Sequence, residues 1–446
     1  MSNIVRSGKA SDIYLRPAEL TQNLIRFNTT NPPGNEAACI SYVEGLLKEA
    51  GLETTVVARD PNRPNVVARL KGRGDAPAIL LQGHIDVVTT ANQDWRHDPF
   101  GGEIIDGYLW GRGALDMKAS VAMMICAVLR ARAEGFVPAG DVLLAVVSDE
   151  EQGGDYGAKW MAENHPELFE GVKYSFGEAG GETAYIEGLK FYPIQVGEKQ
   201  ICQLQAILRG PGGHGSIPMH GGAMAKLGKL LTTLDTHRLP VHITPAVEAM
   251  IRAVAAALPA PRNSALLGLL DPTKTDVILD SLGVFARMLD PLLHNTVNAT
   301  MIEGGLAINV IPGEIKLKLD GRLLPGFRPD DILKELHDLL GDDAEFEVLR
   351  FDEYTTVADM EVYDLLADIL READPGGIPV PYILGGVTDG RHFAKLGIKN
   401  YGFTPLLLPE DNTLIGTVHA ADERVPVDGI DFGAECMYKL LQRYGQ

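Results

Sequence analysis

Three short apolar segments of this chain each end at side chains that can bind a metal ion. The segments are ILLQGHIDVV, with His84 and Asp86, VLLAVVSDEEQGG, with Glu150 and Glu151, and KYSFGEAGG, with Glu178. Short apolar runs between turn signals are typical of buried strands. In an open α/β sheet, ligands bind beside the carboxyl ends of the strands. The pattern therefore predicts a sheet whose rim carries a polar, metal-binding site.

The first part of the chain alternates between strand-like and helix-like segments. We expect helices at 36–50 and from 118 onward, and strands at 65–70, 79–82, 142–147 and around 174–176. Such alternation is typical of a largely parallel sheet covered by helices. The fold class that it predicts is α/β with a mostly parallel sheet.

The pattern changes after residue 196. A strand, a helix, two strands, a helix and a last strand are expected, the strands at 201–210, 298–305, 314–323 and 344–351. This order predicts a smaller α+β domain at 197–352, inserted into a catalytic domain formed by 1–196 and 353–446. Between Leu239 and Pro291 the chain is rich in Ala, Leu and Pro. That segment could pack inside the inserted domain, enlarge a dimer interface or line an acyl pocket.

Composition excludes several classes of protein. The 446 residues include 40 basic and 60 acidic side chains, a formal charge of −20, whereas a nucleic-acid surface needs a basic patch. The four cysteines are far apart and form no CxxC pair, so nothing indicates a disulfide framework. The N-terminal segment has no apolar core of signal-peptide length, and no stretch approaches the roughly 18 apolar residues of a membrane span. We therefore expect a soluble, cytoplasmic protein that binds neither nucleic acid nor membrane.

The candidate metal residues have the chemistry of a two-metal hydrolytic centre. Zinc in catalytic sites takes imidazole nitrogen and carboxylate oxygen, and paired metals share a bridging group. Asp116, in the loop GRGALDMK before a helix, is suited to bridge, although alone it could be a helix N-cap. Adjacent residues point in different directions. One of Glu150 and Glu151 can therefore bind metal while the other faces the substrate.

The order of the motifs resembles a known family. GHIDVV, GRGALDMK, SDEE, GEAGG, GGHGS, GGVTDGRHF and VHAADERV follow one another as in the dinuclear-zinc amidohydrolases. These include aminoacylase, acetylornithine deacetylase, succinyl-diaminopimelate desuccinylase and glutamate carboxypeptidase, and the carboxypeptidase S-like branch is most similar. The resemblance implies a zinc-hydrolase catalytic domain with an inserted ferredoxin-like domain for dimerisation and lid closure. It implies hydrolysis of the amide bond in N-acyl amino acids or short peptides with a free carboxylate.

Carried over by position, the resemblance assigns roles at the metal centre. It implies one Zn²⁺ on His84 and Glu178, a second on Glu151 and His419, Asp116 bridging both, Glu150 as catalytic base and Asp86 as the partner of His84. It also implies a cis peptide bond after Asp116. Because imidazole and carboxylate also suit Co²⁺ and Mn²⁺, the ligands leave the native metal open.

The resemblance also implies a homodimer and a set of substrate contacts. His214, in PGGHGSIP, would enter the partner subunit's active site and hold the oxyanion; alternatively it is a hydrogen-bonded turn histidine. Arg322 would bind substrate, or would pair with an acidic neighbour in its own domain. The substrate contacts implied are Asn298, Arg322, Gly386, Thr388 and Arg391.

Two other functions share these residues. An aminopeptidase or dipeptidase would use the same metal centre, but Arg322 and Arg391 favour recognition of a carboxylate. A homologue without catalysis should have lost a ligand or the base, and all of them are present here.

Overall fold

The computed structural model describes residues 10–283, 286–353, 358–411 and 413–446. The chain divides into two units. Unit 1 is Met1–Val196, Asp359–Tyr382 and Thr388–Gln446, and unit 2 is Gly197–Ala358 and Ile383–Val387. Unit 2 thus extends past the expected end at 352 and includes a second short segment. That segment belongs there because the Lys199 amide donates to the Leu384 carbonyl at 2.9 Å.

A nine-stranded sheet forms the centre of unit 1. Its main path runs β1 (Glu53–Val57), β2 (Asn65–Leu70), β6 (Val142–Val147), β3 (Ala78–His84), β7 (Val172–Gly177), β17 (Lys399–Gly402), β9 (Leu189–Glu198) and β16 (Ile378–Leu384), and β8 (Ala184–Ile186) pairs with β9. β6, β3, β7 and β17 are parallel to one another, whereas β1, β2 and β9 pair antiparallel. The expected mostly parallel centre is confirmed. The antiparallel edges and the β8–β9 hairpin were not predicted.

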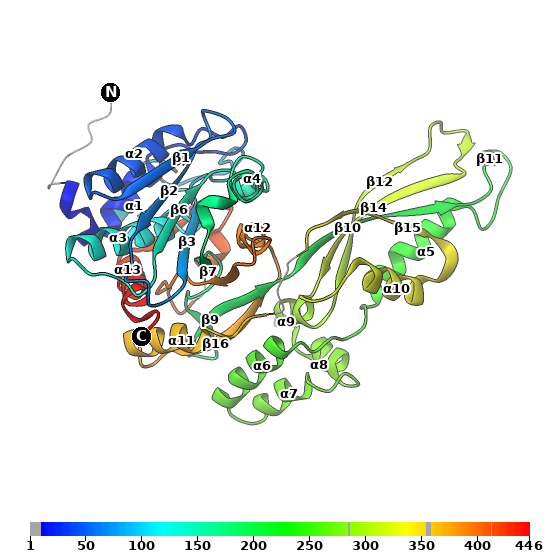
Figure 1. The fold of residues 1–446 in the computed structure, drawn as a ribbon. Helices are drawn as coiled ribbons and strands as arrows, with labels where there is room; N and C mark the ends of the chain where they lie inside the picture. Colours follow the sequence, from blue (N-terminus) through cyan, green and yellow to red (C-terminus); the bar gives the residue numbers. More distant parts are fainter. Residues whose placement is uncertain (1–9, 284–285, 354–357, 412) are drawn as a thin grey trace. The chain divides into compact units, whose positions relative to one another are not determined.

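Helices cover both faces of this sheet (Figure 1). They are α1 (Pro17–Ile25), α2 (Ala37–Glu49), α3 (Lys118–Ala133), α4 (Ala158–Asn164), α11 (Tyr363–Ala373), α12 (Gly390–Ala394) and α13 (Val427–Arg443). α3 packs against β3, β6 and α13, while α12 packs against β7 and α4. α3 is apolar on most sides and almost wholly buried, as expected for a helix between a sheet and other helices. A small sheet of β4 (Glu103–Ile105), β5 (Tyr108–Trp110) and β18 (Arg424–Pro426) completes the unit.

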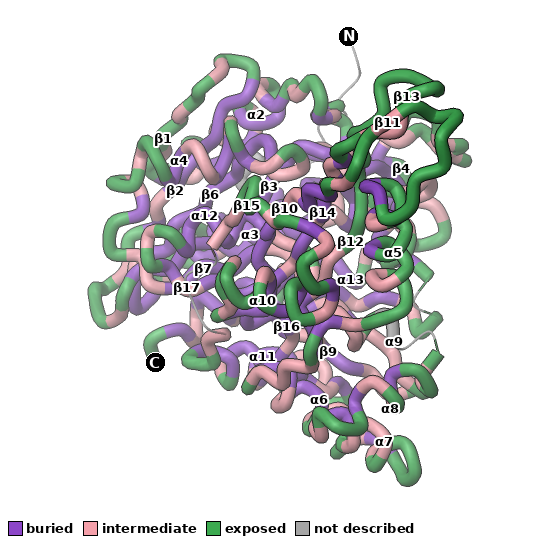
Figure 2. Tube along the Cα trace, turned by 90° about the vertical axis from the view of Figure 1, so that its right-hand side faces the viewer, coloured by how far each residue is buried: buried purple, intermediate pink, exposed green. Residues whose placement is uncertain are grey.

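Unit 2 is built on a four-stranded antiparallel sheet. Its order is β12 (Thr296–Gly304), β14 (Glu314–Leu323), β10 (Gln200–Arg209) and β15 (Glu345–Phe351). α5 (Ala223–Thr236) and α10 (Pro329–Leu340) bury their apolar residues against one face of this sheet. β11 (Gly213–His214) and β13 (Val310–Ile311) form a separate ribbon, whose chain is largely exposed in Figure 2.

The segment rich in Ala and Leu forms four helices of unit 2. They are α6 (Pro245–Ala257), α7 (Arg262–Gly268), α8 (Thr275–Ser281) and α9 (Ala286–Leu293). Many of its apolar residues are buried, and Leu239 belongs to the core under the sheet. Packing inside unit 2 therefore accounts for much of its apolar character. No helix among the described residues is both long enough and apolar enough to cross a membrane.

Candidate metal centre

Three of the predicted ligand segments end at one rim of the unit 1 sheet. His84 is the last residue of β3, Glu178 follows β7 directly, and Glu150 opens a 3-10 turn, η2 (Glu150–Gln152), after β6. Because β6, β3 and β7 are neighbouring parallel strands, their carboxyl ends lie together. Asp116 precedes α3, and His419 comes from the loop before β18.

The five predicted ligands form two groups that share Asp116. One group is His84, Asp116 and Glu178, the other is Asp116, Glu151 and His419, and the ligand atoms within each lie within 4.8 Å of one another. Each oxygen of Asp116 faces one imidazole: Oδ1 lies 3.1 Å from His84 Nε2, and Oδ2 lies 3.1 Å from His419 Nε2. His84 Nε2 is 3.5 Å from Glu178 Oε2, and His419 Nε2 is 3.3 Å from Glu151 Oε2. A carboxylate between two such groups is placed so that it could bridge a pair of metal ions.

The electrostatics of these groups fit bound cations. Burial opposes ionisation of Asp116, but hydrogen bonds with His419 and His84 outweigh it and lower the pKa of that carboxyl. Hydrogen bonds to Asp116 and Glu151 raise the pKa of His419 to about 10. Glu151 Oε1 is buried and has no hydrogen-bond partner among the described residues. This surplus of carboxylate charge, with nitrogen and oxygen donors only, matches what zinc takes in catalytic sites.

Glu150 lies beside the two groups but belongs to neither of them in the described part of the chain. Burial, and then the nearby charge of Glu178, raises the pKa of Glu150 well above its usual range. The 3-10 turn that carries it is held by Asp86, whose carboxylate accepts the amides of Glu150 at 3.1 Å and Glu151 at 3.2 Å. Of the two adjacent glutamates, Glu151 thereby belongs to a ligand group, and Glu150 lies beside it.

Asp86 also contacts the His84 ring, through both its backbone carbonyl and its carboxylate. His84 Nδ1 lies 3.0 Å from the Asp86 carbonyl oxygen and 3.5 Å from Oδ1, so the carbonyl is the closer acceptor. Asn31 was not predicted, and its amide bridges Asp86 Oδ2 at 2.8 Å and Asp149 Oδ1 at 2.9 Å. Asp149 in turn pairs with Arg63 at 2.9 Å. Only Asp149 had a signal in the sequence, since it lies in the SDEE motif.

A buried carboxylate, Glu423, anchors the loop that presents Asp116. Its Oε1 accepts the amides of Leu115 at 2.7 Å and Asp116 at 3.1 Å, and its Oε2 accepts the Gly113 amide at 3.1 Å. Arg112 Nη1 donates to the same Oε2 at 2.6 Å. The peptide bond between Asp116 and Met117 is cis, as expected. Glu423 lies in VHAADERV, but the motif does not reveal which acidic residue is structural.

Four of the predicted site residues belong to unit 2. His214 is exposed on β11, and its Nδ1 lies 2.7 Å from Ser216 Oγ and accepts the Ser216 amide at 3.2 Å. Asn298 lies on β12 opposite Asp320 of β14. Arg322 pairs with Asp320, which agrees with the expected alternative that this arginine pairs with an acidic neighbour in its own domain. Gly386 also belongs to unit 2.

Thr388 and Arg391 lie in unit 1, at the start of α12. Both are buried, and Arg391 Nη1 donates to the Thr388 carbonyl at 2.9 Å, while Arg391 Nε has no hydrogen-bond partner among the described residues. Asp389, between them, was not predicted. Burial raises the pKa of Asp389 to about 8, and ionisation of Asp389 would further raise the pKa of Glu150. GGVTDGRHF thus places a buried polar cluster beside the proposed base.

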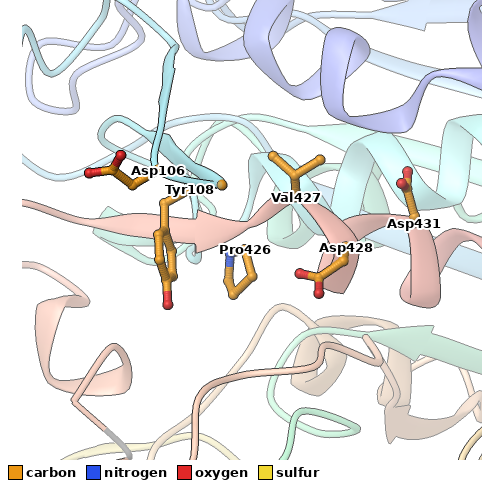
Figure 3. Close-up of a pocket in the computed structure, with 7 residues that line it drawn as sticks. Asp106, Tyr108, Pro426, Val427, Asp428 and Asp431 are labelled. Carbon is orange, nitrogen blue, oxygen red and sulfur yellow. The ribbon is translucent and has the colours of Figure 1, made fainter.

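A separate cavity of about 410 Å³ opens on unit 1 (Figure 3). The turn between β4 and β5 and the start of α13 line it, with Asp106, Tyr108, Asp428 and Asp431 among its residues. None of the lining residues is a predicted site residue, so the cavity is distinct from the metal centre.

The sequence profile of peptidase family M20/M25/M40 matches residues 80–443. The chain belongs to this family. It is 28% identical to the probable carboxypeptidase S-like 2 of Dictyostelium discoideum, over 82% of this chain and 71% of that protein. It is 26% identical to aminoacylase-1 of Sus scrofa, over 91% and 89% of the two chains.

Solved structures agree with the family assignment at the level of the fold. The M20 family metallo-carboxypeptidase Sso-CP2 from Sulfolobus solfataricus superposes with a TM-score of 0.67 at 17% identity, covering 96% of this chain and 99% of that one. This member of the M20/M25/M40 family is therefore a metal-dependent hydrolase.

Proposed function

We propose that this protein is a di-zinc amidohydrolase. Its substrate would be an N-acyl amino acid or a short peptide with a free α-carboxylate. The observation that carries the proposal is Asp116, whose two oxygens each face a histidine of a different ligand group at 3.1 Å. The names of its relatives, a carboxypeptidase S-like protein and an aminoacylase, support amide hydrolysis next to a carboxylate.

The proposed ligands divide between the two cations. His84 and Glu178 would hold one, Glu151 and His419 the other, and Asp116 both. When bound, the pair would lower the pKa of water and polarise the amide carbonyl. Asp86 would orient His84, and Glu423 would hold the backbone that presents Asp116.

Glu150 is proposed as the general base. Its carboxylate lies beside the ligand groups without joining them, and its pKa is raised by burial and by Glu178. A carboxylate of raised pKa can accept the proton of the attacking water and then deliver it to the departing nitrogen.

His214 would stabilise the oxyanion, acting from the partner subunit of a homodimer. A backbone amide can only donate, so the Ser216 amide on His214 Nδ1 places the proton of the neutral ring on Nε2. His214 Nε2 has no hydrogen-bond partner among the described residues. It is therefore a free N–H donor on an exposed ribbon, the kind of group that an oxyanion needs.

Asn298, Arg322, Gly386, Thr388 and Arg391 are proposed to bind the rest of the substrate. Arginine suits a carboxylate because its planar fork makes two parallel hydrogen bonds. We propose unit 2 as the dimerisation and lid unit, which would bring Asn298, Arg322 and Gly386 to the bound substrate.

The test is hydrolysis of a mixed panel followed by mass spectrometry. The panel holds N-acetyl, N-succinyl and long-chain N-acyl amino acids, dipeptides, and peptides blocked at either terminus, with Glu150→Gln as control. Cleavage that needs a free carboxylate supports the proposal. Cleavage that needs a free amine would make the protein an aminopeptidase, and metal binding without any cleavage would indicate a silent homologue.

A further inference from the structure

The sheet of unit 2 has one apolar and one polar face. Along β14, buried residues alternate with partly exposed ones, and the buried set packs against α5 and α10. Asp320 and Arg322 belong to the other set and point to the polar face. Asn298 lies opposite Asp320, and Thr296 lies opposite Arg322. Residues opposite one another share a face, so these four side chains form one polar row.

Within this row, Asp320 holds Arg322 by one edge of its guanidinium. Arg322 Nε donates to Asp320 Oδ1 at 3.0 Å, and Arg322 Nη2 donates to Asp320 Oδ2 at 3.2 Å. Arg322 has no other hydrogen-bond partner among the described residues. A guanidinium carries five N–H donors, and this pair uses two of them.

The donors left on Arg322 form a second edge. Nη1 and the remaining N–H of Nη2 point parallel to one another, away from the side chain's own stem, and match the spacing of a carboxylate. The Arg322 side chain is 28% exposed, so it combines a fixed orientation with access for a ligand.

We infer that Asp320 is a positioning residue that presents the free edge of Arg322 to the substrate carboxylate. The inference rests on the proposed function, in which Arg322 reads that carboxylate. A long arginine side chain loses rotamer freedom when it binds a ligand, and this loss weakens binding. Because Asp320 lies two residues away on the same rigid strand, Arg322 is already ordered before substrate arrives. Asp320 does not block the ligand, since it occupies the other edge.

The experiment compares an N-acyl amino acid with its carboxamide, which lacks the charge. For each variant the ratio of kcat/KM for the acid to that for the amide is measured. Asp320→Ala should lower this ratio about three- to tenfold, mainly through KM for the acid. Asp320→Asn, which keeps one acceptor oxygen, should fall between the wild type and Asp320→Ala. The rate on the carboxamide reports folding, because a damaged fold would lower both rates together.

A matched control lies on the same sheet. Asp352 holds Arg350 at the same spacing, with Nε 3.0 Å from Oδ1, and Asp352→Ala should leave the ratio unchanged. If Arg322→Ala lowered the ratio but Asp320→Ala left it unchanged or raised it, the role of Asp320 would be wrong and the proposed function would stand. Asp320 would then either have no effect on substrate binding or compete with the substrate for Arg322. A ratio that Arg322→Ala does not change would instead remove the proposed carboxylate contact itself.

Discussion

Glu423→Gln should loosen the loop that presents Asp116, although the two side chains have the same shape. The Glu423 carboxylate accepts four hydrogen bonds, two on each oxygen. A glutamine amide replaces one oxygen with an NH₂ donor. Whichever way the amide turns, two donors lose their acceptor and face another donor.

The size of the effect follows from burial. The side chains of Glu423 and Arg112 are 0% and 1% exposed, and breaking one partner of a buried ion pair costs about 3–5 kcal/mol. At about 1.4 kcal/mol per factor of ten, the lower value predicts amide exchange more than about 100-fold faster at Leu115 and Asp116. Metal affinity should fall by about 10- to 100-fold, the usual effect of removing a group that orients a ligand.

Hydrogen exchange of the loop peptide, read by mass spectrometry on metal-free protein, measures the first effect, and competition with a chelating dye measures the second. Glu435→Gln is the matched control, because Glu435 pairs with Arg130 at 2.6 Å but is 48% exposed. Such surface pairs contribute at most about 1 kcal/mol. If the Glu423 variant exchanged within about fivefold of the wild type and bound metal equally well, the anchoring role would be wrong.

Three further predictions concern the base, the partner subunit and one buried lysine. Glu150→Gln should keep both metal ions and lose most turnover, whereas Glu151→Gln should also lose metal. Metal content is measured by plasma mass spectrometry, and equal metal loss in both variants would contradict the separation of base from ligand. Inactive Glu150→Gln and His214→Ala chains, mixed and refolded together, should recover activity through hybrid dimers, and no recovery would refute action in trans. Burial, and then the charge of Arg322, lowers the pKa of Lys199 to about 7 from its ordinary 10.5. The unfolded chain therefore binds more protons between about pH 7 and 10.5, and stability rises with pH across that window. The gain in melting temperature from Lys199→Met should be largest near pH 7 and fade toward pH 10; a constant difference would contradict the assigned pKa.

The sequence by itself determined the fold class and most of the candidate centre. Short buried strands in a parallel sheet place the residues after them at one rim, so His84, Glu150 and Glu178 could be placed together from local pattern alone. The inserted unit was also predictable, because the alternation changes character after residue 196. These inferences need only the period of the apolar residues and the direction of the strands.

Only the tertiary structure decided which groups hold the centre in shape. His419 and Glu423 come from one loop late in the chain, yet each contacts the loop of Asp116. Glu423 accepts four hydrogen bonds in the interior, whereas His419 belongs to one of the two ligand groups. Acidic residues look alike in a sequence, and their roles differ by burial and by the donors around them. The pairing of Arg322 with Asp320 was open for the same reason: a hydrogen bond depends on distances between side-chain atoms, and strand periodicity specifies only the face on which they lie.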